Sequence, residues 1–178
     1  LHYNNMTGTL PTALGDMKNM QELSLSLNKL IGSLPSELGI LSMLRYLHLG
    51  VNDLIGSIPI EFGQLTNLEE LDLSYNALSG SLREEMGGLT ALKYLALSEN
   101  RLSWFLPSAL SRLTALRVLS VDRNSILGNI PTELGLFTSL AHLEMGGNQL
   151  SGSLPTHLGR LTMLSFLGVG YNRLSGSI

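Results

Sequence analysis

Residues 44–67 read LRYLHLGVNDLIGSIPIEFGQLTN, and residues 68–91 read LEELDLSYNALSGSLREEMGGLTA. Aligned one above the other, the two stretches share leucines, an asparagine and a glycine at the same places. The asparagine recurs every 24 residues, at Asn4, Asn28, Asn52, Asn76, Asn100, Asn124, Asn148 and Asn172. A constant period of this length predicts a solenoid, in which each repeat packs only on its neighbours. We therefore expect a single domain over residues 1–178 with about seven repeats.

Each repeat contains a leucine pair of the form L-x-L, such as Leu47 and Leu49. Because side chains alternate along a strand, both leucines of a pair point to the same side. This pattern predicts one short strand per coil, with successive coils paired in parallel at about 4.8 Å. The asparagine follows the strand, and a buried amide there needs backbone partners. We expect a structural ladder of Asn28, Asn52, Asn76, Asn100, Asn124 and Asn148.

The second half of the repeat carries a glycine and then, in most coils, a proline, as at Gly56 and Pro59. Proline has no backbone donor and suits an outer corner better than a central ladder. The stretch that follows the proline, such as residues 36–41, is too short for a standard helix. A single 3₁₀ or α turn on the convex side is the natural prediction.

One region departs from the repeat pattern. Arg83 stands where other coils have proline, and Trp104, followed by Phe105, stands where other coils have glycine. Trp104 and Phe105 are therefore candidates for a lateral binding anchor. The alternative is that the tryptophan covers a local packing defect.

The unit L-x-x-L-x-L-x-x-N-x-L-x-G-x-[IL]-P resembles the plant-specific class of leucine-rich repeat over essentially the whole chain. The resemblance implies an α/β leucine-rich repeat solenoid that forms a right-handed superhelix. It places short parallel strands on the concave face, lateral second strands after the asparagine, and short turns on the convex face. It also implies a protein or peptide recognition module, as in plant receptor kinases and receptor-like proteins, in immune or stress signalling.

Two other roles stay open at this stage. Strictly 24-residue repeats with L-T-A-L segments, at residues 89–92 and 113–116, are also similar to the repeat regions of algal Roco-type GTPases. That resemblance would place the chain in an intracellular signalling protein. An inhibitor of a secreted polysaccharide-degrading enzyme, similar to polygalacturonase-inhibiting proteins, is the other alternative.

The composition of the chain limits the classes of partner that we expect it to bind. The net charge of −3 argues against nucleic acid or a membrane surface as a general partner. No apolar run approaches the roughly 20 residues that cross a bilayer, so no direct membrane contact is expected. The chain has no cysteine and runs from Leu1 to Ile178 within repeats, without polar end caps. We expect a fragment of a longer protein that self-associates end to end, in either the cytoplasm or the cell exterior.

The strand positions that point away from the leucine core, with the two residues before each asparagine, form the expected binding surface. Acids outnumber bases among them, and tyrosines supply apolar faces with polar tips, as binding hot spots do. This favours a protein or peptide ligand with basic character. The candidate residues are Tyr46, His48, Glu70, Asp72, Tyr75, Tyr94, Glu99, Asp122, Arg123, His142 and Glu144.

The sequence contains none of the common catalytic motifs. His48, Asp72 and Ser74 could approach one another on adjacent strands, but no pocket or oxyanion hole accompanies them. His142 and Glu144 share one strand face, where an open surface leaves such groups solvated. We therefore expect no enzyme activity, no cofactor and no metal.

Overall fold

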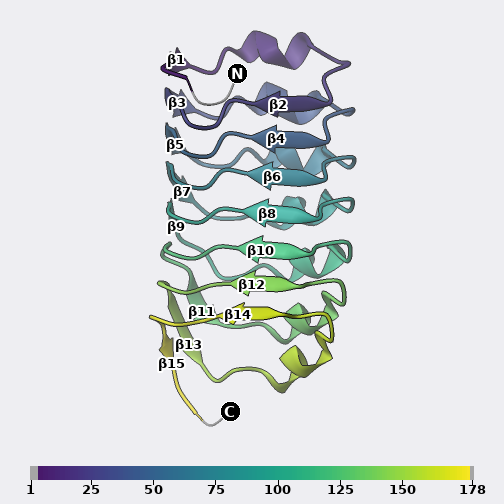
Figure 1. The fold of residues 1–178 in the computed structure, drawn as a ribbon, viewed down its shortest axis with the longest axis vertical. Coiled ribbons are helices and arrows are strands. Elements are labelled where there is room, and N and C mark those ends of the chain that lie inside the picture. The colour runs from purple at the N-terminus through teal and green to yellow at the C-terminus, as the bar shows by residue number, and fades with distance from the viewer. Residues whose placement is uncertain (1–3, 177–178) are drawn as a thin grey trace.

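The computed structural model describes residues 4–176, so Leu1 and Ile178, which the sequence assigns to core columns, lie outside the described residues. The chain forms a stack of coils, each of which contributes one strand to a seven-stranded parallel sheet (Figure 1). In stacking order these strands are β2 (Glu22–Ser24), β4 (Tyr46–His48), β6 (Glu70–Asp72), β8 (Tyr94–Ala96), β10 (Val118–Ser120), β12 (His142–Glu144) and β14 (Phe166–Gly168).

Residues that pair in neighbouring strands of this sheet are one repeat apart in the sequence. Leu47 of β4 lies opposite Leu71 of β6, and Leu71 lies opposite Leu95 of β8. All three leucines are fully buried. The L-x-L pattern therefore predicts both the strand and the face that it buries.

A second row of strands lies along one side of the stack, after the asparagines (Figure 1). Five of them form one sheet: β1 (Thr7–Thr9), β3 (Lys29–Ser33), β5 (Asp53–Gly56), β7 (Ala77–Gly80) and β9 (Arg101–Leu102). Three more form another: β11 (Leu127–Asn129), β13 (Gln149–Gly152) and β15 (Arg173–Leu174). Between β9 and β11 the pairing narrows to an isolated bridge from Phe105 to Leu127.

The convex side of each coil is a single 3₁₀ turn. The turns are η1 (Thr12–Asp16), η2 (Ser36–Ile40), η3 (Ile60–Gln64), η4 (Glu84–Gly88), η5 (Ser108–Arg112), η6 (Thr132–Leu136) and η7 (Thr156–Arg160). Proline precedes every turn except η4, where Arg83 adopts the same extended conformation (φ −91°, ψ 159°). The corner therefore tolerates the loss of proline. No helix among residues 4–176 has the length and apolar character needed to cross a bilayer.

The asparagine ladder ties each coil to the one before it. Asn76 Oδ1 accepts a 3.0 Å hydrogen bond from the backbone N–H of Leu54 in the preceding coil. Its Nδ2 donates to the carbonyl of Leu49 in that coil at 3.1 Å, and to the carbonyl of Leu73 in its own coil at 3.2 Å. The same set of bonds recurs at Asn52, Asn100, Asn124, Asn148 and Asn172. These are the backbone contacts expected of the buried amides, and their contribution to stability stays a prediction.

Candidate ligand-binding surface

The open face of the seven-stranded sheet presents the side chains that the sequence assigned to ligand binding. Two of them, Tyr75 and Arg123, are exposed. The rest are half-buried: Tyr46, His48, Glu70, Asp72, Tyr94, Glu99, Asp122, His142 and Glu144. None of these residues belongs to the buried core, and their role in ligand binding stays a prediction.

A shallow hollow of about 470 Å³ lies over strands β2 to β8. We name it the first hollow, and its lining is Glu22, Ser24, Ser26, Leu27, His48, Glu70, Asp72 and Tyr94. Three carboxylates and a phenol thus converge on one open depression. A cation or a hydrogen-bond donor fits that chemistry.

Two of the three carboxylates of the first hollow, those of Glu70 and Asp72, are held by separate polar contacts. His48 Nε2 lies 3.1 Å from Glu70 Oε2. Asp72 Oδ1 accepts hydrogen bonds from the backbone N–H of Ser74 at 2.9 Å and from its hydroxyl at 2.6 Å. The serine proton therefore points to Asp72 and the imidazole to Glu70, so the three groups of a hydrolytic triad are not assembled here.

The pKa of Tyr94 is affected by the negative charge of the first hollow. Burial raises the pKa of its phenol, and the charges of Asp72 and then Glu70 raise it further. Both effects disfavour the phenolate. Tyr94 therefore stays a neutral hydroxyl with an apolar ring beside two carboxylates.

The three tyrosines of the surface are spread out rather than clustered. Tyr46 and Tyr94 occupy the same register position on β4 and β8, with Glu70 of β6 between them. Tyr46 packs near the guanidinium of Arg45, 5.5 Å from its ring centroid. Tyr75 lies after β6 and is 55% exposed. Among residues 4–176 no ring contact joins these three tyrosines.

The residue before each ladder asparagine adopts a left-handed backbone conformation. Tyr75 has φ 52°, Glu99 has φ 54° and Arg123 has φ 50°. This conformation is unfavourable for residues with a Cβ. In the sequence, the one indication of this feature is Gly147, the glycine that occupies the position of Arg123 one coil later.

A second hollow of about 590 Å³ lies toward the C-terminal coils. Its lining is Asp122, Arg123, Glu144, Gly146, Gly147, Gly170 and Tyr171. Glu144 Oε1 accepts a 3.0 Å hydrogen bond from the backbone N–H of Gly146. A Cβ at Gly168 would lie 2.0 Å from Glu144 Oε2. The carboxylate of Glu144 therefore occupies space that a side chain at this position would fill.

Other polar groups near the second hollow already have partners. Arg123 donates a 2.5 Å hydrogen bond to Glu99 Oε1, which raises the pKa of the guanidinium. The Ser98 hydroxyl donates to Asp122 Oδ1. His142 stacks on Phe166, with ring centroids 4.3 Å apart. No group of metal-ligating side chains in the described part of the chain is placed to hold an ion.

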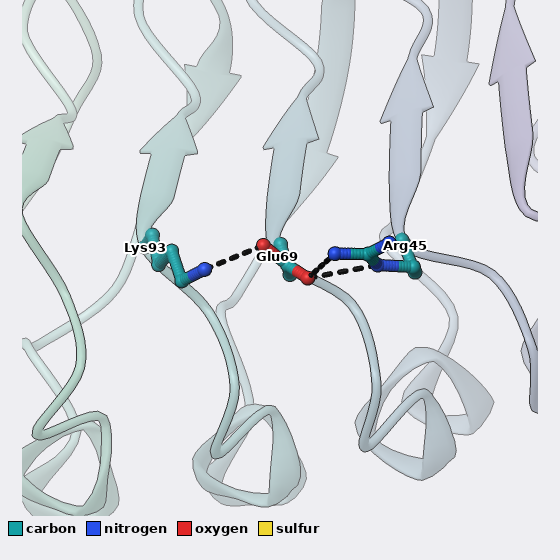
Figure 2. Close-up of polar contacts among 3 residues, drawn as sticks. All are labelled: Arg45, Glu69 and Lys93. Carbon is teal, nitrogen blue, oxygen red and sulfur yellow. Dashed lines mark hydrogen bonds and ion pairs between the residues drawn. The ribbon is translucent and has the colours of Figure 1, made fainter.

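Sequence reasoning missed a charged row along the edge where the strands begin. Figure 2 shows Glu69 between Arg45 of the preceding coil and Lys93 of the following coil. Glu69 accepts hydrogen bonds from Arg45 Nε at 2.8 Å and from Lys93 Nζ at 2.6 Å. The bonds from Lys93 and then Arg45 lower the pKa of Glu69, and Glu69 in turn raises the pKa of Arg45. Opposite charges at the 24-residue spacing were the available signal.

The two lateral candidates, Trp104 and Phe105, differ in their exposure to solvent. Trp104 is 4% exposed and belongs to the core, with its indole N–H unpartnered among the described residues. Phe105 is 70% exposed and covers Gly128 of the next coil, where a Cβ would lie 2.5 Å from the ring. This arrangement favours the packing interpretation for the tryptophan.

Comparison with known proteins agrees with the geometry. Leucine-rich repeat family models match residues 54–102 and residues 19–41, 115–137 and 139–161, together more than half of the chain. A solenoid with a leucine core, an asparagine ladder and an open parallel sheet defines the leucine-rich repeat class. The chain belongs to this family, and it resembles the repeat ectodomains of plant receptor kinases. No curated protein sequence matches it.

Three solved structures illustrate the likeness. The Arabidopsis receptor kinase HAESA, in complex with the peptide hormone IDA and the co-receptor SERK1, is 32% identical with a TM-score of 0.97 over 100% of this chain. PEPR1 with AtPEP1 is 38% identical with a TM-score of 0.95 over 98% of this chain. A leucine-rich repeat protein of Leptospira interrogans is 35% identical with a TM-score of 0.84 over 98%. This chain spans 30%, 24% and 43% of those chains, respectively.

Proposed function

We propose that the open sheet of this chain binds a peptide or protein segment, as the recognition module of a signalling receptor, and that the module itself is not catalytic. The observation that carries the proposal is the row of half-exposed polar and aromatic side chains on one rigid sheet. Tyr46, Glu70 and Tyr94 stand in register on three adjacent strands. Side chains fixed in this way lose little freedom on binding.

The comparisons support a peptide ligand. HAESA and PEPR1, which this chain resembles in fold and sequence, have structures with the peptide hormone IDA and with AtPEP1. We also propose a role in immune or stress signalling, which rests only on the resemblance of the repeat pattern to plant receptor kinases. The acidic character of the surface favours a ligand with basic residues.

Random peptides displayed on phage and selected on the immobilised 178-residue chain test this proposal. We expect the selected peptides to lose at least tenfold in affinity against Tyr75→Ala, because truncating an aromatic anchor often costs about 2 kcal/mol. The matched control is Glu133→Ala, an exposed change on the convex turn η6, which should leave affinity unchanged. Peptides that lose affinity with Glu133→Ala and not with Tyr75→Ala would refute the assignment of the binding face.

A further inference from the structure

The irregular coil of the stack carries a third hollow, outside the open sheet. It has a volume of about 520 Å³ and is lined by residues 81–84, residues 103–108 and Leu127. We name it the lateral hollow, since none of its lining residues belongs to the seven-stranded sheet. The departures from the repeat pattern, Arg83 in place of proline and Trp104 followed by Phe105, all lie in its lining. Positions that break an otherwise consistent pattern are the expected places for function.

Trp104 changes the backbone of this coil and leaves one polar group without a partner. Glycine occupies its position in the other coils with a left-handed backbone, as at Gly80 (φ 80°) and Gly128 (φ 79°). Trp104 lies outside the left-handed region, which a bulky side chain avoids. The residue is 4% exposed, and its indole N–H has no partner among residues 4–176. Buried donors without a partner are uncommon, and an acceptor group of a ligand in the lateral hollow would account for this one.

Phe105 adds an isolated aromatic surface to the lateral hollow. Its ring lies against Gly128 of the next coil, yet 70% of the residue is exposed. The other coils have small, exposed polar residues at this position: Thr9, Ser33, Ser57, Ser81, Asn129 and Ser153. The apolar surface is therefore about one ring in size, with polar groups on either side. A stable protein interface buries about 800 Å² on each partner around an apolar centre, so this surface favours a smaller ligand.

The lateral hollow also holds hydrogen-bonding groups of both kinds. The guanidinium of Arg83 is exposed and takes part in no ion pair among the described residues. Glu84 Oε2 accepts a 3.1 Å hydrogen bond from the backbone N–H of Ala109, which fixes the carboxylate across the coils. The two charges are opposite, and the exposed hydroxyls of Ser81 and Ser103 lie in the same lining. A neutral ligand whose hydroxyls both donate and accept matches these groups.

We infer that the lateral hollow binds a neutral oligosaccharide, with one sugar ring packed on Phe105 and its hydroxyls bonded to Arg83 and Glu84. A pyranose ring has an apolar C–H face of about the size of a phenyl ring and hydroxyls around its edge. It therefore needs one aromatic surface surrounded by donors and acceptors, as this hollow provides. The inference goes beyond the proposed function, because the lateral hollow shares no residue with the two hollows of the open sheet. Trp104 keeps its packing role and forms part of the wall.

A glycan microarray of neutral, acidic and basic oligosaccharides, probed with the 178-residue chain, tests this inference. We expect neutral oligosaccharides to bind, and Phe105→Ser to weaken their binding at least tenfold, because the ring supplies the apolar contact. Serine is the residue of several other coils at this position, so the variant should fold, which thermal melts check. Phe105→Tyr keeps the ring and should keep the binding. The matched control is Leu136→Ala on η6, which trims a 47% exposed apolar side chain and should leave binding unchanged.

Fluorescence gives a second readout, because Trp104 is the only tryptophan of the chain and lines the lateral hollow. Titration with the oligosaccharide that binds most strongly should change its emission in a saturable way, and Phe105→Ser should abolish that change at the same concentrations. An array on which no neutral oligosaccharide binds would overturn the inference. Glycan binding that Phe105→Ser leaves unchanged would do the same, as would library-selected peptides that need Phe105. The proposed function is tested separately at Tyr75, so failure of one is distinguishable from failure of the other.

Discussion

Lys93 Nζ donates a 2.6 Å hydrogen bond to Oε2 of Glu69, a residue one repeat earlier in the sequence and adjacent in the stack. Arg45, one repeat earlier again, binds the other oxygen of the same carboxylate. Three coils are therefore linked by side chains at one column of the repeat, outside the asparagine ladder (Figure 2). A solenoid is held together only by contacts between neighbours, so a link of this kind acts on cooperativity between coils.

Glu69→Gln should lower the melting temperature slightly at neutral pH, because the amide loses both ionic partners. The pKa of Glu69 is lowered in the folded chain, so its contribution is present above the ordinary glutamate pKa of about 4.3 and is lost as the pH falls through the lower folded value. Thermal melts at pH 7 and near pH 3 should show the difference from wild type closing in acid. It should also shrink in about 1 M salt. A difference that ignores both pH and salt contradicts an ionic origin, and Glu133→Gln supplies the baseline.

Asn76→Leu should destabilise the chain, because Leu54 N–H and Leu49 C=O both lose the amide of the ladder. Each buried group left without a partner costs about 1–3 kcal/mol. The matched control is Asn67→Leu, at an asparagine outside the ladder. Asn67 also bonds to the preceding coil, through Nδ2 to the Ser42 carbonyl at 2.8 Å, but it does so at the exposed surface. Equal melting temperatures for the two variants would show that the ladder has no special structural role.

Tyr94 should make the chain sensitive to alkali. Its pKa is raised by burial and by the two carboxylates, so the folded state holds the phenolic proton more tightly than the unfolded state does. The stability that this provides is present below the unfolded tyrosine pKa of about 10 and is lost as the pH rises through the folded value. Urea melts from pH 8 to 11 should show wild type losing more stability than Tyr94→Phe. Tyr171→Phe, at a 95% exposed site, is the control and should follow the wild-type curve. If Tyr94→Phe follows the wild-type curve as well, the environment of the first hollow does not make Tyr94 a source of alkali sensitivity.

The repeat made much of this architecture predictable. Leucine and asparagine columns fix strand, core and ladder because each position meets its own equivalent in the next coil, as Leu47 meets Leu71. The side chains of the open face were also predictable, since they alternate with that core. The lateral strands and the 3₁₀ turns agree with what the family resemblance implied.

Pairing of individual side chains was not predictable. His48 contacts Glu70 while Ser74 binds Asp72, a choice that depends on rotamers and not on column identity. The exposure of Phe105 beside the buried Trp104 likewise depends on how one irregular coil packs. The left-handed backbone at Tyr75 is imposed by the turn into the ladder asparagine, and the residue itself does not favour it.

Two glycines on the concave face should respond differently to the same substitution. Gly147 has φ 63°, and a Cβ there would lie 3.1 Å from Arg123 Cγ. Alanine at this position should cost about 1–2 kcal/mol, the usual penalty of a left-handed residue with a Cβ. Gly170 lies outside the left-handed region and has no atom within 4 Å of its Cβ direction.

Gly170→Ala should therefore be neutral or stabilising, by about 0.4–1 kcal/mol, because alanine restricts the unfolded chain. Denaturant melts of Gly147→Ala and Gly170→Ala measure the contrast directly, and both variants remove a glycine from the second hollow. The other coils place leucine, valine, tyrosine, glutamate or arginine at the position of Gly147 and therefore already bear this strain. Equal stabilities for the two alanine variants would mean that the left-handed position carries no strain that glycine relieves.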